Sequence, residues 1–317
     1  MSPTPHLLIP LAASTAEGCR QALQDLALPQ IDRLLARLTP AGLDAGSETD
    51  FSPPHERALA RHLGLPAGQE GRIPWAAWHR QQMQPQAAQD AAWAFITPCQ
   101  WQAGANHVLL ADPALLRLTE ADSRALLEIL APWFAEDGIT LIYDQPTRWL
   151  ARGAVFDGLA TASLARVLQR DVSAWLPDKL QARALHRLHS EMQMLLYTHP
   201  FNDARAAQGL PPVNAFWAHG AGALPRLPEY MQAPEMPTTL LDAALREDWA
   251  AWVAAWKALD AGPVARLAGH VADGGSARLT LCGERSAMTW YTARRSLGQR
   301  IQGLFRPQRF ASVREQL

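Results

Sequence analysis

The densest group of residues able to do ligand chemistry lies at 191–225, in EMQMLLYTHPFNDARAAQGLPPVNAFWAHGAGALP. Pro200 should separate two helices, because the residue before a proline is disfavoured in the α region. Asn202 and Arg205 stand three apart on the second helix and therefore share a face. Asn214 follows at an expected strand over residues 213–218. We expect these amide and guanidinium groups to form a polar pocket at the end of a sheet that can hold a small anion.

A second interpretation of the same residues involves no ligand. Asn202 and Asn214 could hold the loops of this segment together through hydrogen bonds to the main chain. Gly220 and Gly222 allow a tight turn or a close approach of the backbone to a ligand, but a Gly-x-Gly pair is a weak signal by itself. Both interpretations of the asparagines stay open at this point.

The spacing of this segment resembles a known signature. HP-x-N-x-x-R-x-x-x-G-x-x-P-x-N-x-x-W-x-x-G-x-G is similar to the motif of archaeal-type, cofactor-independent phosphoglycerate mutases. In this sequence it is carried by His199, Pro200, Asn202, Arg205, Gly209, Pro212, Asn214, Trp217, Gly220 and Gly222. The stretches EMQMLLYTHP and GLPPVN resemble still more closely a bacterial branch of that family, the RpfE-type regulatory proteins.

The resemblance implies an α/β fold of the alkaline phosphatase superfamily, a mostly parallel sheet flanked by helices with a smaller inserted α/β lobe. Residues 1–97 and 191–317 would form the discontinuous core domain, and residues 98–190 the inserted substrate-type lobe. The first strand and RLTLC (278–282) would then lie in one sheet. The resemblance also implies that Asn202, Arg205 and Asn214 contact the ligand.

Arg148 of the inserted lobe is a further candidate, because a guanidinium can clamp phosphate or carboxylate bidentately. We expect it to close over an anion held by the motif residues. Arg152 is a candidate clamp with the same chemistry.

The metal ligands of the related enzymes have no counterpart here. Those enzymes use two divalent metals, held by Asp and His, to activate a serine. In this sequence PLAA follows the first strand and GERS follows RLTLC, and no serine has a matching context. We therefore expect no metal and no cofactor, and we assign no catalytic residue. His186 and His189, three apart on a predicted helix, are the alternative metal ligands, although we expect them to be structural.

These observations predict a degenerate phosphoglycerate-mutase-like protein, a pseudoenzyme that binds a small phosphorylated or carboxylate metabolite in a regulatory role. The alternative is an active phosphoglycerate mutase or phosphohydrolase with relocated metal ligands. The sequence does not decide whether this protein is an enzyme.

Composition excludes other classes of partner. The formal net charge is −1 and 19% of residues are charged, which argues against a nucleic-acid or membrane-surface binder. No apolar run approaches the ~20 residues of a membrane span. Three widely separated cysteines indicate reduced thiols and a cytoplasmic protein. The basic tail RRSLGQRIQGLFRPQRFASVR could bind nucleic acid, but we expect Leu297, Ile301 and Phe305 to dock it on the core.

The elements that must position these residues follow from hydrophobic periodicity. Residues 40–54, rich in Gly, Ser, Asp and Pro, should form a loop. Thr119 and Asp122 form a capping-box-like start for a helix that stops at Gly138. Helices are expected over 55–64, 75–84, 121–137, 179–197 and 239–259, and strands over 6–11, 93–97, 107–110, 139–143, 147–151, 278–282 and 287–291.

Overall fold

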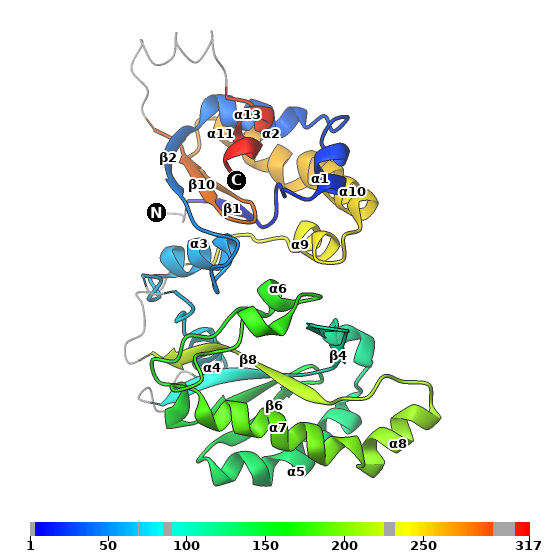
Figure 1. Ribbon diagram of the computed structural model, residues 1–317. Helices are drawn as coiled ribbons and strands as arrows, with labels where there is room; N and C mark the ends of the chain where they lie inside the picture. Colours follow the sequence, from blue (N-terminus) through cyan, green and yellow to red (C-terminus); the bar gives the residue numbers. More distant parts are fainter. Residues whose placement is uncertain (1–3, 69, 85–90, 225–231, 294–307) are drawn as a thin grey trace. The chain divides into compact units, whose positions relative to one another are not determined.

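The computed structural model describes residues 4–68, 70–84, 91–224, 232–293 and 308–317 (Figure 1). Its contacts divide the chain into two compact units. Unit 1 comprises Met1–Gly64 with Glu229–Leu317, and unit 2 comprises Leu65–Pro228. Within the described residues, no helix combines the length and the apolar character needed to cross a membrane.

Unit 1 is built from segments at both ends of the chain. Its strands are β1 (His6–Ile9), β2 (Thr39–Asp44), β9 (Arg278–Cys282) and β10 (Ala287–Tyr291). Its helices are α1 (Glu17–Ala22), α2 (Pro29–Arg37), α3 (Pro54–Leu63), α9 (Thr239–Ala244), α10 (Trp249–Leu259), α11 (Ala265–Ala272) and α13 (Phe310–Val313). A π-helical stretch, Asp260–Val264, joins α10 to α11.

The strands of unit 1 form one four-stranded sheet in the order β1-β9-β10-β2. β1 pairs with β9 in parallel, with Leu7 opposite Leu279, whereas β10 is antiparallel to both β9 and β2. One face packs with α2, α10 and α11 in a core that contains Trp252, Trp256 and Trp290. α3 covers the opposite face, on which Leu8 and Cys282 lie. The prediction that the first strand and RLTLC share a sheet is confirmed.

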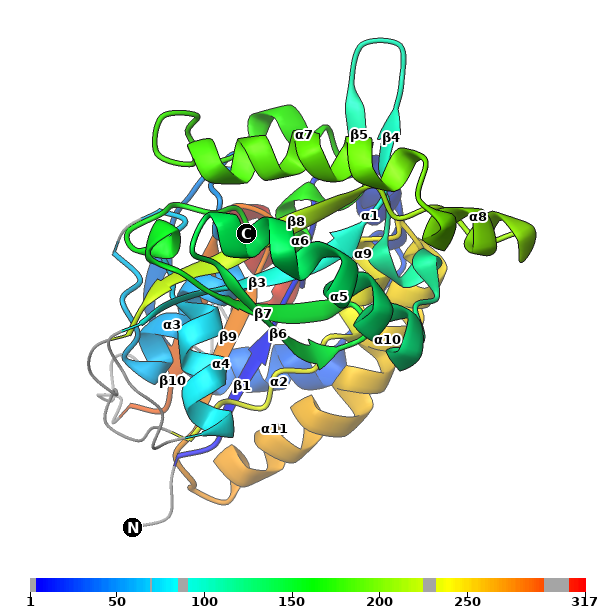
Figure 2. The ribbon, with the colours of Figure 1, turned by 90° about the horizontal axis from the view of Figure 1, so that it is seen from below.

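Unit 2 contains its own sheet and helices. Its strands are β3 (Ala92–Cys99), β4 (Trp101–Ala103), β5 (Val108–Leu110), β6 (Thr140–Gln145), β7 (Arg148–Arg152) and β8 (Ala215–Ala223). Its helices are α4 (Trp75–Met83), α5 (Glu120–Glu136), α6 (Leu164–Val167), α7 (Arg183–Tyr197) and α8 (Pro200–Ala207), with short 3-10 turns at Pro113–Leu116, Ala154–Phe156 and Val172–Ala174. Figure 2 shows the β4–β5 hairpin extending beyond α7.

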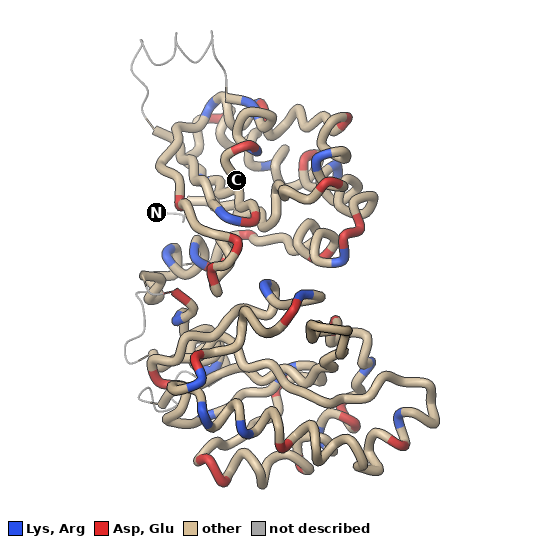
Figure 3. The backbone as a smooth tube through the Cα atoms, in the orientation of Figure 1, with Lys and Arg blue, Asp and Glu red and all other residues tan. Residues whose placement is uncertain are grey.

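The main sheet of unit 2 has the order β6-β7-β3-β8, and each neighbouring pair is antiparallel. α5 and α7 pack on one face, where Ile96, Trp149 and Phe216 are buried. Side chains alternate across a strand, so Phe95 and Thr97 point to the other face, where α4 contacts β3 and β8. Charged residues of both signs are interspersed along the chain in each unit (Figure 3).

Three expectations about the fold differ from the structure. Each unit combines helices and strands, as expected for an α/β protein. Among the described strands, β1 and β9 pair in parallel and the other pairs are antiparallel, so a mostly parallel sheet is not confirmed. The expected domain boundaries at 97/98 and 190/191 fall inside unit 2, because β3 pairs with β8 and α7 packs on their sheet. The expected loop over residues 40–54 begins with strand β2, since an edge position tolerates Pro40.

Local signals in the sequence match the observed ends of the elements around the motif. α7 ends at Tyr197 and α8 begins at Pro200, as the His-Pro pair predicts. Thr119 and Asp122 form the full capping box of α5, and Gly138 adopts φ +70° after that helix. The predicted docking of the basic tail through Leu297, Ile301 and Phe305 concerns residues outside those described.

Candidate functional site

The motif forms a compact connection from α7 through α8 to β8. His199 caps α8, and its Nδ1 accepts a hydrogen bond of 3.1 Å from the backbone N–H of Phe201. Gly209 ends the helix with φ +70°, a conformation that favours glycine. The chain then passes through two prolines into β8. Asn202, Arg205 and Asn214 all lie along this connection.

Asn202 is used entirely by the main chain of this connection. Its Nδ2 donates to the carbonyls of Leu196 (2.9 Å) and Val213 (2.8 Å), and its Oδ1 accepts from the Val213 N–H (3.0 Å). Both amide hydrogens are therefore occupied. Asn202 ties the end of α7 to the start of β8, which is the ligand-free interpretation of this residue.

Asn214 has a similar structural role at the start of β8. Its Oδ1 accepts from the N–H of Trp101 (2.7 Å), and its Nδ2 donates to the carbonyl of Trp101 (2.9 Å). This two-bond pairing fixes the turn between β3 and β4 against β8. A ligand would have to break one of these bonds to reach the amide.

Arg205 is buried, with 3% of its surface exposed. Nε donates to the carbonyl of Pro211 (2.9 Å) and Nη2 to that of Leu116 (2.5 Å). Nη1 is also buried and has no hydrogen-bond partner in the described structure. Burial lowers the pKa of this guanidinium, and the charge of Asp122 partly opposes that shift. Arg205 is a cation without an ion-pair partner among the described residues, but its surface is closed to solvent.

Gly220 and Gly222 serve close packing of the backbone. Both have positive φ, +61° and +147°. A Cβ on Gly220 would lie 2.9 Å from the Cβ of Trp75, and one on Gly222 would lie 3.0 Å from the Cβ of Pro74. The Gly-x-Gly pair therefore admits the start of α4 against β8.

Arg148 lies apart from the other three predicted residues, at the start of β7. Its Nε and Nη2 both contact Oδ2 of Asp144, at 2.8 and 2.7 Å. The guanidinium carbon lies 4.7 Å from the centre of the Phe95 ring, a cation–π distance. Phe95 points to the α4 side of the sheet, whereas Val213, which Asn202 binds, belongs to the core on the α5 and α7 side. The four predicted residues therefore do not converge on one site.

His79 of α4 completes a polar cluster with Asp144 and Arg148. Its Nε2 lies 3.2 Å from Oδ1 of Asp144 and 3.5 Å from Nη2 of Arg148. A carboxylate can only accept, so Nε2 carries the hydrogen and Nδ1 keeps a lone pair when the ring is neutral. The side chains of Arg148 and His79 are 30% and 26% exposed, and that of Asp144 is 7% exposed.

The electrostatics of this cluster keep Asp144 ionised. Burial by itself would raise the pKa of Asp144, but hydrogen bonds from His79 and Arg148 lower it below its ordinary value. His219 lies beyond Phe95 and its Nε2 is 3.2 Å from Oγ1 of Thr97. Burial, with the nearby charge of Arg148, lowers the pKa of His219 to about 3, so this ring is neutral.

Sequence reasoning identified Arg148 but missed its partners His79, Asp144, Phe95 and His219. One signal was available: Asp144 and Arg148 flank the turn of a predicted hairpin, and such positions face each other across the strands. His79 and His219 come from α4 and β8, and sequence spacing gives no sign of their approach.

The carboxyl edge of β1 and β9 is where the resemblance to phosphoglycerate mutases predicts metal ligands. Here the backbone N–H of Ala12 donates to the carbonyl of Cys282 (2.7 Å). The carboxylate of Glu284 accepts from the Ser14 hydroxyl (2.8 Å) and from the hydroxyl and N–H of Thr15 (2.6 and 3.1 Å). Both carboxylate oxygens face protein donors, which does not suit a two-metal site.

The turn after β1 is strained and firmly held. Leu11 has φ +46°, which is uncommon for a residue with a side chain. The indole N–H groups of Trp252 and Trp256 donate to the carbonyls of Leu11 (3.0 Å) and Ala12 (3.1 Å). Ser14 lies three residues before the first residue of α1, and its hydroxyl accepts a hydrogen bond from the N–H of Ala16, the N-cap residue.

The histidine pair of α7 does not form a metal site with a third ligand. His186 Nε2 contacts the carbonyl of Pro177 (2.9 Å), and His189 Nε2 contacts that of Phe216 (3.0 Å). The His189 ring stacks on Phe216, and burial lowers its pKa to about 4. Within the described ranges, no three His, Cys, Asp or Glu side chains are grouped closely enough to hold a metal ion.

No family model matches this chain, and no curated protein does. Two solved structures are similar to it along most of their length. The PH0037 protein from Pyrococcus horikoshii has 12% identity and a TM-score of 0.43, with 92% of this chain and 88% of that chain covered. The cofactor-independent phosphoglycerate mutase from Thermoplasma acidophilum DSM 1728 has 12% identity and a TM-score of 0.37, with 92% and 91% covered. At these values neither similarity assigns an activity to this chain.

Proposed function

We propose that this protein is a phosphoglycerate-mutase-like, non-catalytic binder of a small phosphorylated or carboxylate ligand, and that Arg148 is the residue that contacts the ligand. The observation that carries the proposal is the state of the Arg148 guanidinium. Nε and Nη2 are held by Asp144, while Nη1 has no partner among the described residues and the side chain is partly exposed. A guanidinium fixed on one edge presents its other donors at little entropic cost.

His79 supports the proposal from the neighbouring helix. Its Nε2–H is directed to Asp144, which orients the ring. Its Nδ1 has no partner among the residues that the structure describes. A protonated ring would donate a second hydrogen bond to an anion on Arg148. The site would then use one guanidinium and one imidazole, with Phe95 beneath the guanidinium.

The absence of phosphotransfer belongs to the same proposal. It is supported by the residues at the carboxyl edge of β1 and β9, where Glu284 is bound by Ser14 and Thr15. We expect the purified protein not to interconvert 2- and 3-phosphoglycerate, with or without manganese. Turnover that rises with manganese and disappears with a chelator would favour the active-enzyme alternative.

Thermal unfolding with added ligand tests the binding site. The probes are inorganic phosphate, 2-phosphoglycerate and 3-phosphoglycerate. A ligand at 100 times its Kd stabilises the native state by about 2.7 kcal/mol, which raises Tm by several degrees in a unit of this size. We expect at least one probe to shift Tm, and Arg148→Ala to abolish the shift.

Arg152→Ala is the matched control. Arg152 lies on the same strand four residues later, on the same face, and is exposed. We expect this variant to keep the full shift. The proposal fails if no probe shifts Tm, or if Arg152→Ala loses the response as completely as Arg148→Ala.

A further inference from the structure

Two histidines meet edge to face in unit 1. His6 begins β1, and His62 lies in the last turn of α3. Their Nδ1 atoms are 3.3 Å apart, and their ring planes make an angle of 69°. In a hydrogen bond between two imidazoles one nitrogen must carry the hydrogen and the other a lone pair. The outer contacts of the two rings determine which is which.

His62 is the acceptor of this pair. Its Nε2 lies 3.0 Å from the carbonyl of Gln232, which can only accept, so Nε2 carries the hydrogen. Neutral His62 therefore has its lone pair on Nδ1. Nη1 of Arg278 lies 3.5 Å from the same nitrogen. A lone pair there suits both the N–H of His6 and the cation.

His6 then has its hydrogen on Nδ1 and its lone pair on Nε2. Nε2 is 2.9 Å from Oγ1 of Thr280, so the threonine hydroxyl donates to it. Oγ1 of Thr280 is in turn 2.9 Å from Oγ1 of Thr289, which must donate. One ordered chain of hydrogen bonds thus runs from β10 through β9 and β1 to α3 and ends at Gln232.

The chain of hydrogen bonds lies where the polypeptide leaves and re-enters unit 1. Unit 1 breaks off at Gly64, two residues after His62, and resumes at Glu229, three residues before Gln232. The returning segment also pairs with β1: Glu235 N–H donates to the His6 carbonyl and the Glu235 carbonyl accepts from Leu8 N–H, both at 2.9 Å. The His62–Gln232 bond therefore joins the two connections of unit 1 to each other.

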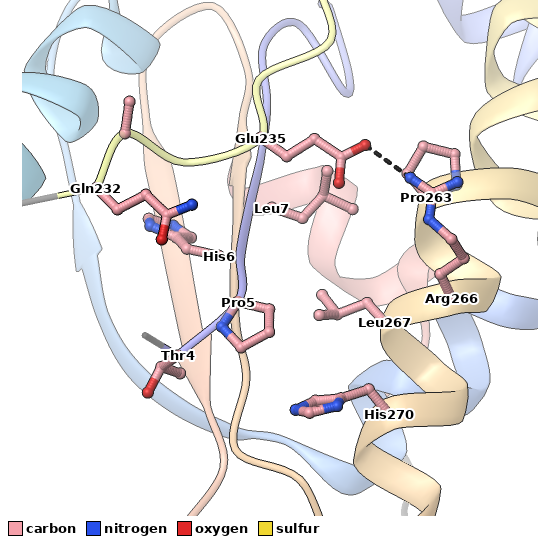
Figure 4. Close-up of a pocket in the computed structure, with 11 residues that line it drawn as sticks. Thr4, Pro5, His6, Leu7, Gln232, Glu235, Pro263, Arg266, Leu267 and His270 are labelled. Carbon is pink, nitrogen blue, oxygen red and sulfur yellow. Dashed lines mark hydrogen bonds and ion pairs between the residues drawn. The ribbon is translucent and has the colours of Figure 1, made fainter. Parts of the chain in front are cut away.

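Figure 4 shows the surroundings of the returning segment. Gln232 and Glu235 lie beside His6 and Leu7 of β1. Arg266 of α11 forms an ion pair of 2.9 Å with Glu235. These residues and His270 line a cavity of about 400 Å³. The segment is held by backbone pairing, by one exposed ion pair and by Met236, which packs against the buried cluster of Leu8, Cys282 and Ala287. Its hydrogen bond to His62 adds a side-chain tie to α3.

We propose that the His6–His62 pair is an acid-sensitive latch on the two connections of unit 1. A proton on His62 adds to Nδ1, where it faces the Nδ1–H of His6 and removes the lone pair that faces Arg278. The His6–His62 hydrogen bond is then lost. The ring of His62 turns away from Gln232, and the segment through Glu235 is freed from β1.

The charges beside the pair come from Arg61, Asp44 and Arg278 on one side and from Arg266 and Glu235 on the other. His6 and His62 also line a second cavity, together with Arg61, Asp44 and Arg278. There Arg61 is neutralised by Asp44 at 2.6 Å, whereas Arg278 has no carboxylate partner among the described residues. On the other side Arg266 is paired with Glu235, and His270 contacts the Ser276 carbonyl. Burial, followed by the charges of His62 and Arg278, lowers the pKa of His6 to about 3. The His6 ring of the closed latch is therefore neutral.

Amide hydrogen exchange tests the latch directly. The readout is protection of the Leu8 and Glu235 amides between about pH 8 and about pH 5, corrected for intrinsic exchange, over the range in which an ordinary histidine titrates. We expect protection of both amides to fall about tenfold per pH unit below the ordinary histidine pKa. Nitrogen chemical shifts should show His62 protonated at Nε2 at neutral pH.

Two variants separate the latch from general acid unfolding. His62→Gln removes the titrating group, and we expect protection of the two amides to become independent of pH. His270→Gln removes another histidine of unit 1 that bonds a carbonyl, and the pH dependence should remain. The proposal is overturned if wild-type protection does not change with pH, if the dependence persists in His62→Gln, or if neutral His62 is protonated at Nδ1.

Discussion

The motif connection from His199 to Gly222 and the cluster of His79, Asp144 and Arg148 belong to the same unit but differ in how their polar groups are used. In the motif, the side-chain amides of Asn202 and Asn214 form hydrogen bonds to the backbone, and Arg205 donates to two carbonyls. In the cluster, the side chains of His79 and Arg148 donate to the carboxylate of Asp144, and both donor side chains remain partly exposed. A long, specific signature can therefore mark how a chain folds, while the exposed donors lie in a group with no signature.

The largest effect expected from this comparison follows Arg205→Ala. The change removes two hydrogen bonds and leaves the Pro211 and Leu116 carbonyls without a donor. A hydrogen bond from a charged group contributes about 1.5–3 kcal/mol, and two such bonds are lost. Urea unfolding should show this loss as a lower midpoint. A change below about 1 kcal/mol would mean that Arg205 does not hold the connection.

The second-largest effect should be the loss of stability on acidification, because His189 stacks on Phe216 of the motif as a neutral ring. Its folded-state pKa, about 4, lies below the ordinary value. The unfolded state therefore binds more protons, and the free energy of unfolding falls as pH drops from about 6.5 towards 4. The difference corresponds to about 3 kcal/mol. His189→Gln should lower the slope of unfolding free energy against pH in this range by about one proton, because His6 and His219, with pKa of about 3, contribute to the same range. An unchanged slope would assign the acid loss to those other groups.

Asn202→Asp replaces the side-chain nitrogen by an oxygen and therefore tests the two hydrogen bonds that this nitrogen donates. The aspartate would place an oxygen against the carbonyls of Leu196 and Val213, where the amide now donates to both. We expect a loss of about 2 kcal/mol, the cost of leaving buried acceptors unpaired. Asn202→Asp and wild type should differ less at acid pH, where a protonated carboxyl regains one donor. Equal stability at neutral pH would contradict the structural role.

Arg148→Ala should change stability least and anion binding most. Its ion pair with Asp144 is partly exposed, and such pairs contribute about 1 kcal/mol or less. Calorimetric unfolding without ligand should therefore show a small shift, while titration with phosphate should show no binding. A stability loss as large as that of Arg205→Ala would remove the distinction between the two regions.

Local features of the fold could be predicted because they depend on neighbouring residues. Pro200 separates two helices through sterics at His199, and Thr119 with Asp122 caps α5. Strand β2 could not be predicted, since Pro40 and Gly42 indicate a loop until β10 supplies a partner. The direction of strand pairing and the domain boundaries depend on contacts across the whole chain, which spacing does not encode.

The candidate site shows the same limit. Asn202 and Arg205 were predicted to share a face and do, because helical spacing determines it. Their hydrogen-bond partners lie up to 89 residues away in sequence, at Leu116, and a polar residue gives no sign of whether it will meet backbone or ligand. His79 and Asp144, 65 residues apart, meet only through the tertiary fold.

The indole contacts of the turn after β1 have counterparts in unit 2, so tryptophan fluorescence can report on each unit. Trp252 and Trp256 are buried and donate to the Leu11 and Ala12 carbonyls in unit 1. Trp149 and Trp217 are equally buried in unit 2 and donate to the Ser123 hydroxyl and the Ala162 carbonyl. Tryptophan emission moves to longer wavelength when water reaches the ring. Replacing the first pair by phenylalanine would therefore weight intrinsic fluorescence towards unit 2, and the difference from wild type would follow the melting of unit 1 without an added dye.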